Sequence, residues 1–146
     1  MTEISFLDIL FRLVVAMVLC AAIGYEREQR GKPAGLRTNA LVGLGTAIVT
    51  IASVEIARLS PNAAVDVSRI ASSILPGIGF IGAGTIIQAR GSVHGLTTAA
   101  SIWIVSAIGI VVGLGMYSIA LIATIMALIT LVVLPAPKEE MGSGKK

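Results

Sequence analysis

Four apolar stretches, separated by short polar segments, run along the chain. They cover roughly residues 6–25, 38–58, 70–89 and 97–134. A bilayer core about 30 Å thick accommodates about 20 helical residues, so the last stretch is too long for one crossing. The run Gly113-Leu114-Gly115-Met116-Tyr117 near its middle predicts a turn between two helices. The pattern therefore predicts an all-α integral membrane protein with five transmembrane helices.

The composition agrees with a membrane location. Apolar residues make up 55% of the 146 residues and charged residues only 13%, against about 25% charged in soluble proteins. The apolar run from about Ile9 to Gly24 is preceded by Glu3 and Asp8 but by no Lys or Arg, unlike the basic start of a signal peptide. We expect residues 1–134 to form one transmembrane domain and 135–146 a short polar cytoplasmic tail. The single cysteine, Cys20, excludes an internal disulfide.

The basic residues sort by membrane side. One side receives the first loop, the third loop and the tail, which hold Arg27, Arg30, Lys32, Arg37, Arg90, Lys138, Lys145 and Lys146. Because cytoplasmic loops carry the excess of Lys and Arg, we expect the amino end of the chain outside and its carboxyl end in the cytoplasm. The net charge of +3 thus reflects where the basic residues lie relative to the membrane. Aromatic residues, which would stack on nucleic-acid bases, make up only 4% of the chain. We therefore expect no nucleic-acid binding.

An internal repeat is visible at an offset of 60 residues. Gly24, Arg30-Gly31, Gly35-Leu36, Thr38, Ala40 and Ala47-Ile48 recur as Gly84, Arg90-Gly91, Gly95-Leu96, Thr98, Ala100 and Ala107-Ile108. The repeat predicts that the first two helices match the third and fourth with the same topology. Such a parallel repeat, about an axis along the membrane normal, occurs in transporters.

A glycine-rich run lies inside the third stretch, at Pro76, Gly77, Gly79, Gly82 and Gly84. One interpretation is close helix packing, since backbones without side chains can approach each other. The other is a helix broken at Pro76, with free carbonyls facing an ion or water path. The spacing of Gly109 and Gly113 in the next helix suits the same packing contact.

The first loop combines charge with helix-capping residues. Glu26 and Arg30 are four residues apart and would pair if the first helix continues. Thr38 or Asn39 can cap the second helix, with Arg37 beside its positive amino end. That combination suits an anion such as a phosphate or a lipid head group. The alternative is a loop that only orients the protein.

Three carboxylates lie near the predicted spans, Asp8, Glu26 and Glu55. They are the candidates for a Mg²⁺ site, since Mg²⁺ takes oxygen ligands. The alternative is ion pairing at the interface, because Arg12 and Arg58 lie four and three residues from Asp8 and Glu55. His94 has no nucleophile and base beside it, so we expect no enzymatic activity. Apart from Mg²⁺ as a ligand or substrate, no cofactor is expected.

Four motifs resemble those of the MgtC/SapB family. They are Gly24-x-Glu26-Arg27, Ala34-Gly35-Leu36-Arg37-Thr38, the run from Gly77 to Gly84, and Gly95-Leu96-Thr97-Thr98-Ala99-Ala100. The resemblance covers residues 6–134. It implies a bacterial inner-membrane protein tied to growth in low Mg²⁺ and, in pathogens, to survival inside macrophages. It also implies a functional surface that includes Glu26, Arg27, Arg37, Thr38, Asn39, Gly95, Thr97 and Thr98.

Two functions follow from the resemblance. Family members are often labelled Mg²⁺ transporters, but the best-known ones look more like regulators of other membrane proteins, including the F-type ATP synthase. Those members have a soluble carboxyl-terminal domain, which we do not expect after Leu134 here. The first hypothesis is a membrane protein that binds or regulates other membrane proteins. The alternative is a carrier of Mg²⁺ or another solute that acts as a homo-oligomer.

Overall fold

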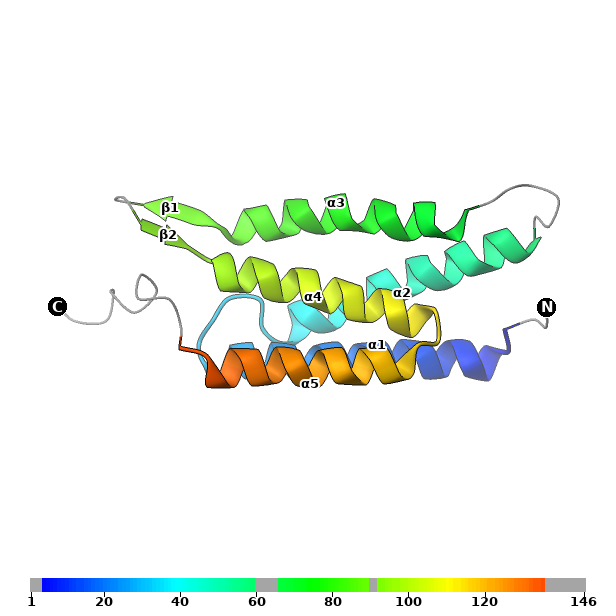
Figure 1. Cartoon of the computed structure of the whole chain (residues 1–146), viewed down its shortest axis with the longest axis horizontal. Coiled ribbons are helices and arrows are strands. Elements are labelled where there is room, and N and C mark those ends of the chain that lie inside the picture. Colours follow the sequence, from blue (N-terminus) through cyan, green and yellow to red (C-terminus); the bar gives the residue numbers. More distant parts are fainter. Residues whose placement is uncertain (1–3, 60–65, 90–91, 136–146) are drawn as a thin grey trace.

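Five helices account for most of the chain in the computed structural model, which describes residues 4–59, 66–89 and 92–135. They are α1 (Phe6–Gln29), α2 (Leu36–Leu59), α3 (Val67–Thr85), α4 (Leu96–Gly113) and α5 (Tyr117–Val133). Successive helices alternate in direction along one long axis (Figure 1). Among the described helices, α1, α2 and α4 are long and apolar enough to cross a membrane, and α5 is a shorter apolar helix. The all-α, five-helix prediction is confirmed.

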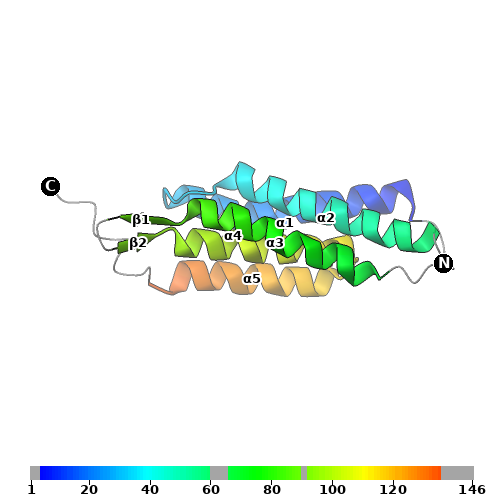
Figure 2. The same cartoon turned by 90° about the horizontal axis from the view of Figure 1, so that it is seen from above.

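Two short strands were not predicted. Strand β1 (Ile87–Ala89) pairs antiparallel with β2 (Ser92–His94), with Ile87 opposite His94. The third helix therefore ends at Thr85 rather than at 89, because a short apolar run such as Ile86-Ile87 fits a strand as well as a helix. The hairpin projects beyond α3 and α4 in both views (Figures 1 and 2). We call this end of the bundle, which also holds the α1–α2 loop, the hairpin end, and the other the turn end.

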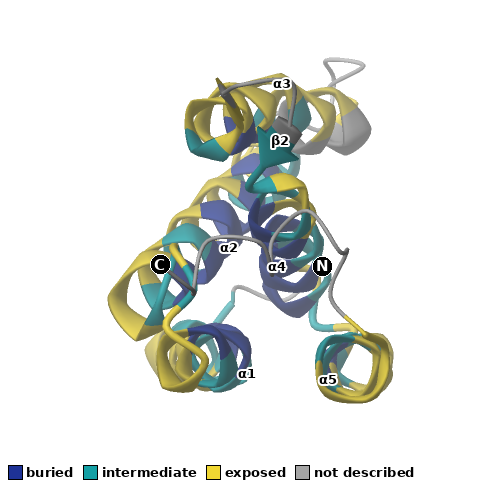
Figure 3. Cartoon of the chain, turned by 90° about the vertical axis from the view of Figure 1, so that its left-hand side faces the viewer, coloured by how far each residue is buried: buried dark blue, intermediate teal, exposed yellow. Residues whose placement is uncertain are grey.

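The helices form three layers. Seen along the bundle, α2 and α4 lie in the middle, with α3 on one side and α1 and α5 on the other (Figure 3). The core cluster comes from α1, α2, α4 and α5 and comprises Ala16, Cys20, Ile23, Ala47, Val105, Ile108, Val112 and Ala120. Helix α3 adds no residue to this cluster, so it is the peripheral helix of the bundle.

Glycines bring α2 close to both α1 and α4. A Cβ on Gly43 would lie 2.6 Å from Cys20 Cβ on α1, and one on Gly109 would lie 2.5 Å from Gly43 O. A Cβ on Gly113 would lie 2.7 Å from Thr50 Cβ. The prediction that Gly109 and Gly113 pack against the third helix is wrong. They face α2, because small-residue spacing marks a close-packing face without naming its partner.

Helix α3 is continuous from Val67 to Thr85, with Pro76 inside it. The broken-helix interpretation is therefore not what the structure shows. Close packing within the chain applies to one glycine of the run: a Cβ on Gly82 would lie 3.5 Å from Ala99 Cβ. Around Gly77, Gly79 and Gly84 no described atom lies within 4 Å of an added Cβ. Gly77 and Gly84 are seven residues apart and share an open face of α3, whereas Gly79 lies on another side of the helix.

The two helix pairs agree with the repeat in direction and in phase. Helices α1 and α3 run the same way, as do α2 and α4 (Figure 1). The second helix of each pair begins at Leu36 or Leu96, which are 60 residues apart. The preceding glycines accept similar first-turn bonds, from Asn39 N at 3.1 Å and from Ala99 N at 2.9 Å. The loops before the two helices differ, because Gly95 itself has φ +87° whereas in the α1–α2 loop the positive φ values are at Gly31 and Ala34. Superposition of the pairs stays a prediction.

Candidate functional site at the hairpin end

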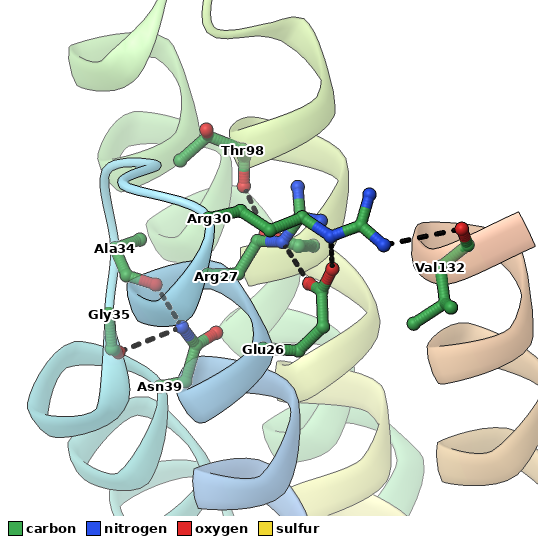
Figure 4. Close-up of polar contacts among 9 residues, drawn as sticks. Glu26, Arg27, Arg30, Ala34, Gly35, Asn39, Thr98 and Val132 are labelled. Carbon is green, nitrogen blue, oxygen red and sulfur yellow. Dashed lines mark hydrogen bonds and ion pairs between the residues drawn. The ribbon is translucent and has the colours of Figure 1, made fainter. Parts of the chain in front are cut away.

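Two arginines share one glutamate where α1 reaches the hairpin end (Figure 4). Arg27 Nε lies 2.5 Å from Glu26 Oε2, and Arg30 Nε lies 2.7 Å from Glu26 Oε1. The side chains of Arg27 and Glu26 are only 5% and 11% exposed. Arg30 also donates to the carbonyl of Val132 at the end of α5, at 3.2 Å. The predicted Glu26–Arg30 pair is confirmed, and the cluster links α1 to α5.

The α1–α2 loop folds tightly around Asn39. This side chain is fully buried, and its Nδ2 donates to Ala34 O and to Gly35 O. Gly24 makes room for the loop, because a Cβ there would lie 2.7 Å from Gly35 O. Two of the sequence motifs, the one at Gly24 and the one at Gly35, are therefore halves of one packing contact.

The amino end of α2 is capped by a residue that the sequence analysis did not name. Leu36 N donates to Glu28 Oε2 at 2.9 Å. The predicted caps, Thr38 and Asn39, lie inside the helix, because α2 begins at Leu36. The carboxylate of Glu28 already stabilises this helix end. Glu28 thus accepts one of the amino-end N–H groups of α2, and the anion site beside Arg37 stays a prediction.

The predicted surface residues separate into two groups. Glu26, Arg27 and Asn39 turn inward, whereas Arg37 and Thr38 are exposed. The buried group has a structural role, since a buried arginine is stable only when it is paired. The inward-facing residues therefore do not share one surface with Arg37 and Thr38.

The residues at the start of α4 divide in a similar way. Thr98 is 2% exposed and, together with Gly95, lines a cavity of about 240 Å³ at the hairpin end. Thr97 points into a groove between α4 and α5, beside Thr130 and Leu131. The cavity brings Gly95 and Thr98 together with Gly31, Lys32 and Pro33 of the α1–α2 loop.

The three carboxylate candidates do not converge. Asp8 lies 2.7 Å from Arg12 and Glu55 lies 2.9 Å from Arg58, as the pairing alternative predicted. Both pairs lie at the turn end, whereas Glu26 lies at the hairpin end. In residues 4–59, 66–89 and 92–135, no group of three or more His, Cys, Asp or Glu side chains is placed to hold a metal ion. The structure therefore assigns no Mg²⁺ ligand set to Asp8, Glu26 and Glu55.

One arginine contact joins distant parts of the chain at the turn end. Arg12 Nη1 donates to Gly113 O, the last residue of α4, at 2.7 Å. A cation at the carboxyl end of a helix stabilises it, because that end carries a partial negative charge. Nothing in the local pattern around Arg12 predicts a partner 101 positions away.

A bundle of apolar, membrane-length helices with ion pairs at both ends defines a multi-span membrane protein. The comparison with protein families gives the group: residues 13–139 match the model of the MgtC family. The chain belongs to this family, as the motif resemblance indicated.

Relatives in several bacteria support the assignment. YhiD of Escherichia coli (strain K12) is 44% identical over 128 residues, which cover 85% of this chain and 59% of YhiD. Protein SrpB of Synechococcus elongatus is 41% identical over 87% of this chain and 75% of SrpB. Protein MgtC of Salmonella typhimurium (strain 14028s) is 45% identical over 82% of this chain and 49% of MgtC. The chain thus spans about half to three-fifths of YhiD and MgtC. No solved structure matches the chain significantly.

Proposed function

We propose that this chain is an inner-membrane protein of Mg²⁺-linked adaptation that acts by binding another membrane protein through α3. The magnesium link is supported by the relatives, one of which, YhiD, carries the name of a proposed magnesium transporter. The mode of action is supported by the open side of α3. The proposed orientation has the amino end outside and the hairpin end in the cytoplasm.

The observation that carries the proposal is the bare face of α3. Gly77 and Gly84, seven residues apart on one face of α3, leave space where side chains would stand, and Phe80 beside them is 84% exposed. Within the membrane, helices associate by van der Waals packing, and small residues let their backbones approach. A partner helix laid along this face would meet these two glycines, with the Phe80 ring beside it. The proposed partner is a transmembrane helix of another membrane protein.

The second candidate is a solute carrier that works as a homo-oligomer. It is favoured by the two helix pairs of like direction, whose second helices begin 60 residues apart. The carboxylates weigh against cation transport, since Asp8, Glu26 and Glu55 are each paired with an arginine. We therefore place the carrier second.

A growth assay combined with a flux assay tests both candidates. Gly77→Leu adds bulk to the open face of α3, where its Cβ meets no described atom of the chain. Ala52→Leu adds similar bulk to an exposed position of α2 and is the matched control. We expect Gly77→Leu to insert normally and fail to support growth in low Mg²⁺, while Ala52→Leu supports it. Full growth with Gly77→Leu would contradict partner binding through α3, and Mg²⁺ flux in proteoliposomes holding only this protein would favour the carrier.

A further inference from the structure

A groove of about 370 Å³ lies between α4 and α5, toward the hairpin end of both helices. It begins at Thr97 and Thr130, close to the first residue of α4 and the last of α5, and reaches Ile104 and Ala123. The helix from Thr97 to Ile104 is about 10 Å long at 1.5 Å per residue. Half of the bilayer core is about 15 Å thick. With the hairpin end at the membrane surface, the groove therefore stays within one leaflet.

The lining of the groove changes from polar to apolar with depth. Thr97 and Thr130 place hydroxyl groups at the hairpin end of the groove, which we call its mouth. Beyond the mouth the lining is apolar except for Ser101, whose Oγ donates to Thr98 O at 2.8 Å. Short side chains on both walls make the groove deep, namely those of Ala100, Ala123 and Ala127. A molecule with a polar head and an apolar chain matches this order.

Arg30 reaches the last turn of α5, the turn that also supplies Thr130 and Leu131 to the groove (Figure 4). Its Nη2 donates to Val132 O at 3.2 Å, and its Nε lies 2.7 Å from Glu26 Oε1. A guanidinium group has five N–H donors, which is more than these two contacts use. The Arg30 side chain is 43% exposed, so its guanidinium is open to a further acceptor.

The charge of the described residues differs between the two ends of the bundle. The hairpin end has four basic and two acidic side chains, a surplus of two positive charges: Arg27, Arg30, Lys32, Arg37, Glu26 and Glu28. The turn end has three of each sign: Arg12, Arg58, Arg69, Asp8, Glu55 and Asp66. The groove thus opens at the end where the described charge is positive, which favours an anionic head group.

We propose that the α4–α5 groove binds an acyl chain of an anionic phospholipid, whose phosphate contacts Arg30. The chain lies along Ala100, Ala123 and Ala127, and the ester groups lie at the level of Thr97 and Thr130. A phosphate accepts charge-assisted hydrogen bonds from a guanidinium, frequently two at once. Basic pockets between transmembrane helices are known sites for anionic lipid head groups.

The dimensions of the groove favour a lipid over a transmembrane helix as its occupant. A helix that crosses the membrane would lie along the whole of α4 and α5, whereas the groove covers about 10 Å. A lipid, by contrast, presents its polar and apolar parts in the order of the lining. No residue of α3 lines this groove, so the inference is independent of the partner binding proposed above.

Native mass spectrometry of the intact chain, released from detergent micelles, tests the proposal. The chain is titrated with dioleoyl phosphatidylglycerol and, in parallel, with dioleoyl phosphatidylcholine, which has the same chains and a zwitterionic head group. We expect one phosphatidylglycerol per chain, bound about fivefold more tightly than phosphatidylcholine because of the charge attraction. Glycerophosphoglycerol, the head group without its chains, should not bind. Equal affinity for the two lipids, or binding of the head group alone, would contradict the proposal.

A pair of arginine variants tests the contact with the head group. Arg30→Gln should weaken phosphatidylglycerol binding about tenfold, as for loss of a hydrogen bond from a charged group. Arg37→Gln removes the same charge at the same end of the bundle, but from the start of α2, which does not line the groove. At high ionic strength, which screens charges that do not touch the lipid, this control should bind nearly as the unsubstituted chain does. An equal loss in both variants would show general attraction instead of a site.

A second pair of variants tests the chain-binding part of the groove. Ala127→Leu fills the groove and should remove the single bound lipid, whereas Ala52→Leu, at an exposed position of α2, should not. Ala100→Leu fills the groove from the opposite wall and serves if Ala127→Leu does not fold. The proposal is overturned if the folded groove variants bind phosphatidylglycerol as tightly as the unsubstituted chain. A dimer without lipid that Ala127→Leu dissociates would also overturn it, because a second copy would then occupy the groove.

Discussion

Gly109 of α4 lies directly against the backbone carbonyl of Gly43 in α2. A Cβ at Gly109 would lie 2.5 Å from Gly43 O, closer than atoms can pack. One turn later, a Cβ at Gly113 would lie 3.0 Å from Ala47 O. The two helices run in the same direction (Figure 1), so residues four apart on one meet residues four apart on the other. The α2–α4 contact is therefore made by backbone at two successive turns.

This contact predicts which glycines tolerate substitution. Gly109→Leu should destabilise the bundle by about 1–3 kcal/mol or more, the usual cost of overpacking. Gly84→Leu, whose Cβ meets no described atom, should leave stability unchanged. Thermal unfolding in detergent measures both variants, and equal melting temperatures would contradict the assigned role of Gly109.

The buried ion pair at the hairpin end predicts a second difference. Glu26→Gln leaves the Arg27 side chain, 5% exposed, without its counter-charge. Removing one partner of a buried pair costs about 3 kcal/mol or more. Arg37→Lys alters an exposed residue and should leave the unfolding temperature unchanged. If chemical unfolding shows the same free energy for both variants, the Glu26–Arg27 pair is not structural.

Loss of the contact between Glu28 and Leu36 N should loosen the first turn of α2. Glu28→Ala removes the acceptor for Leu36 N and should cost about 0.5–2 kcal/mol, the range for loss of an amino-terminal cap. Hydrogen exchange should quicken in the first turn of α2 and stay the same in α5. Glu28→Gln keeps an oxygen acceptor and should show a smaller effect. Unchanged exchange near Leu36 in Glu28→Ala would argue against the cap.

The contacts of Arg12 predict that this side chain stabilises the packing of α1 against the end of α4. Arg12→Met removes both the pair with Asp8 and the bond to Gly113 O, so we expect a loss of about 1–3 kcal/mol, as for a hydrogen bond from a charged group. Arg58→Met breaks a pair within one helix and should cost less, about 0.5 kcal/mol. Melting temperatures give the order, and a larger loss in Arg58→Met would refute the coupling.

The orientation is tested by labelling. With Cys20 replaced by Ala, Lys32→Cys should resist an impermeant thiol reagent in intact cells and react after permeabilisation, because the first loop is expected in the cytoplasm. A cysteine in place of Leu114, in the turn between α4 and α5, is the matched position on the other side. Labelling of position 32 in intact cells would show that the first loop lies outside and that the expected orientation is wrong.

Hydropathy was sufficient to predict the five helices and the turn around Gly115, because lipid requires long apolar segments with internal backbone bonds. It did not predict the hairpin from Ile87 to His94, since three-residue strands leave no periodicity to read. Likewise, the glycine spacing predicted that Gly109 packs closely but not that α2 is its partner. The bond from Arg12 to Gly113 O and the cap by Glu28 depend on the tertiary arrangement, which no local pattern in one sequence reports.

The two arginines near the ends of α1 also set a length. Arg12 holds the carbonyl at the end of α4, and Arg30, just past Gln29, holds the one near the end of α5. Eighteen residues of helix separate them, which is about 27 Å at 1.5 Å per residue. Charge is inexpensive at the level of the lipid head groups, so we expect both guanidinium groups there. The spacing of Arg12 and Arg30 along α1 then predicts a hydrocarbon layer of about 27 Å, slightly thinner than the common 30 Å.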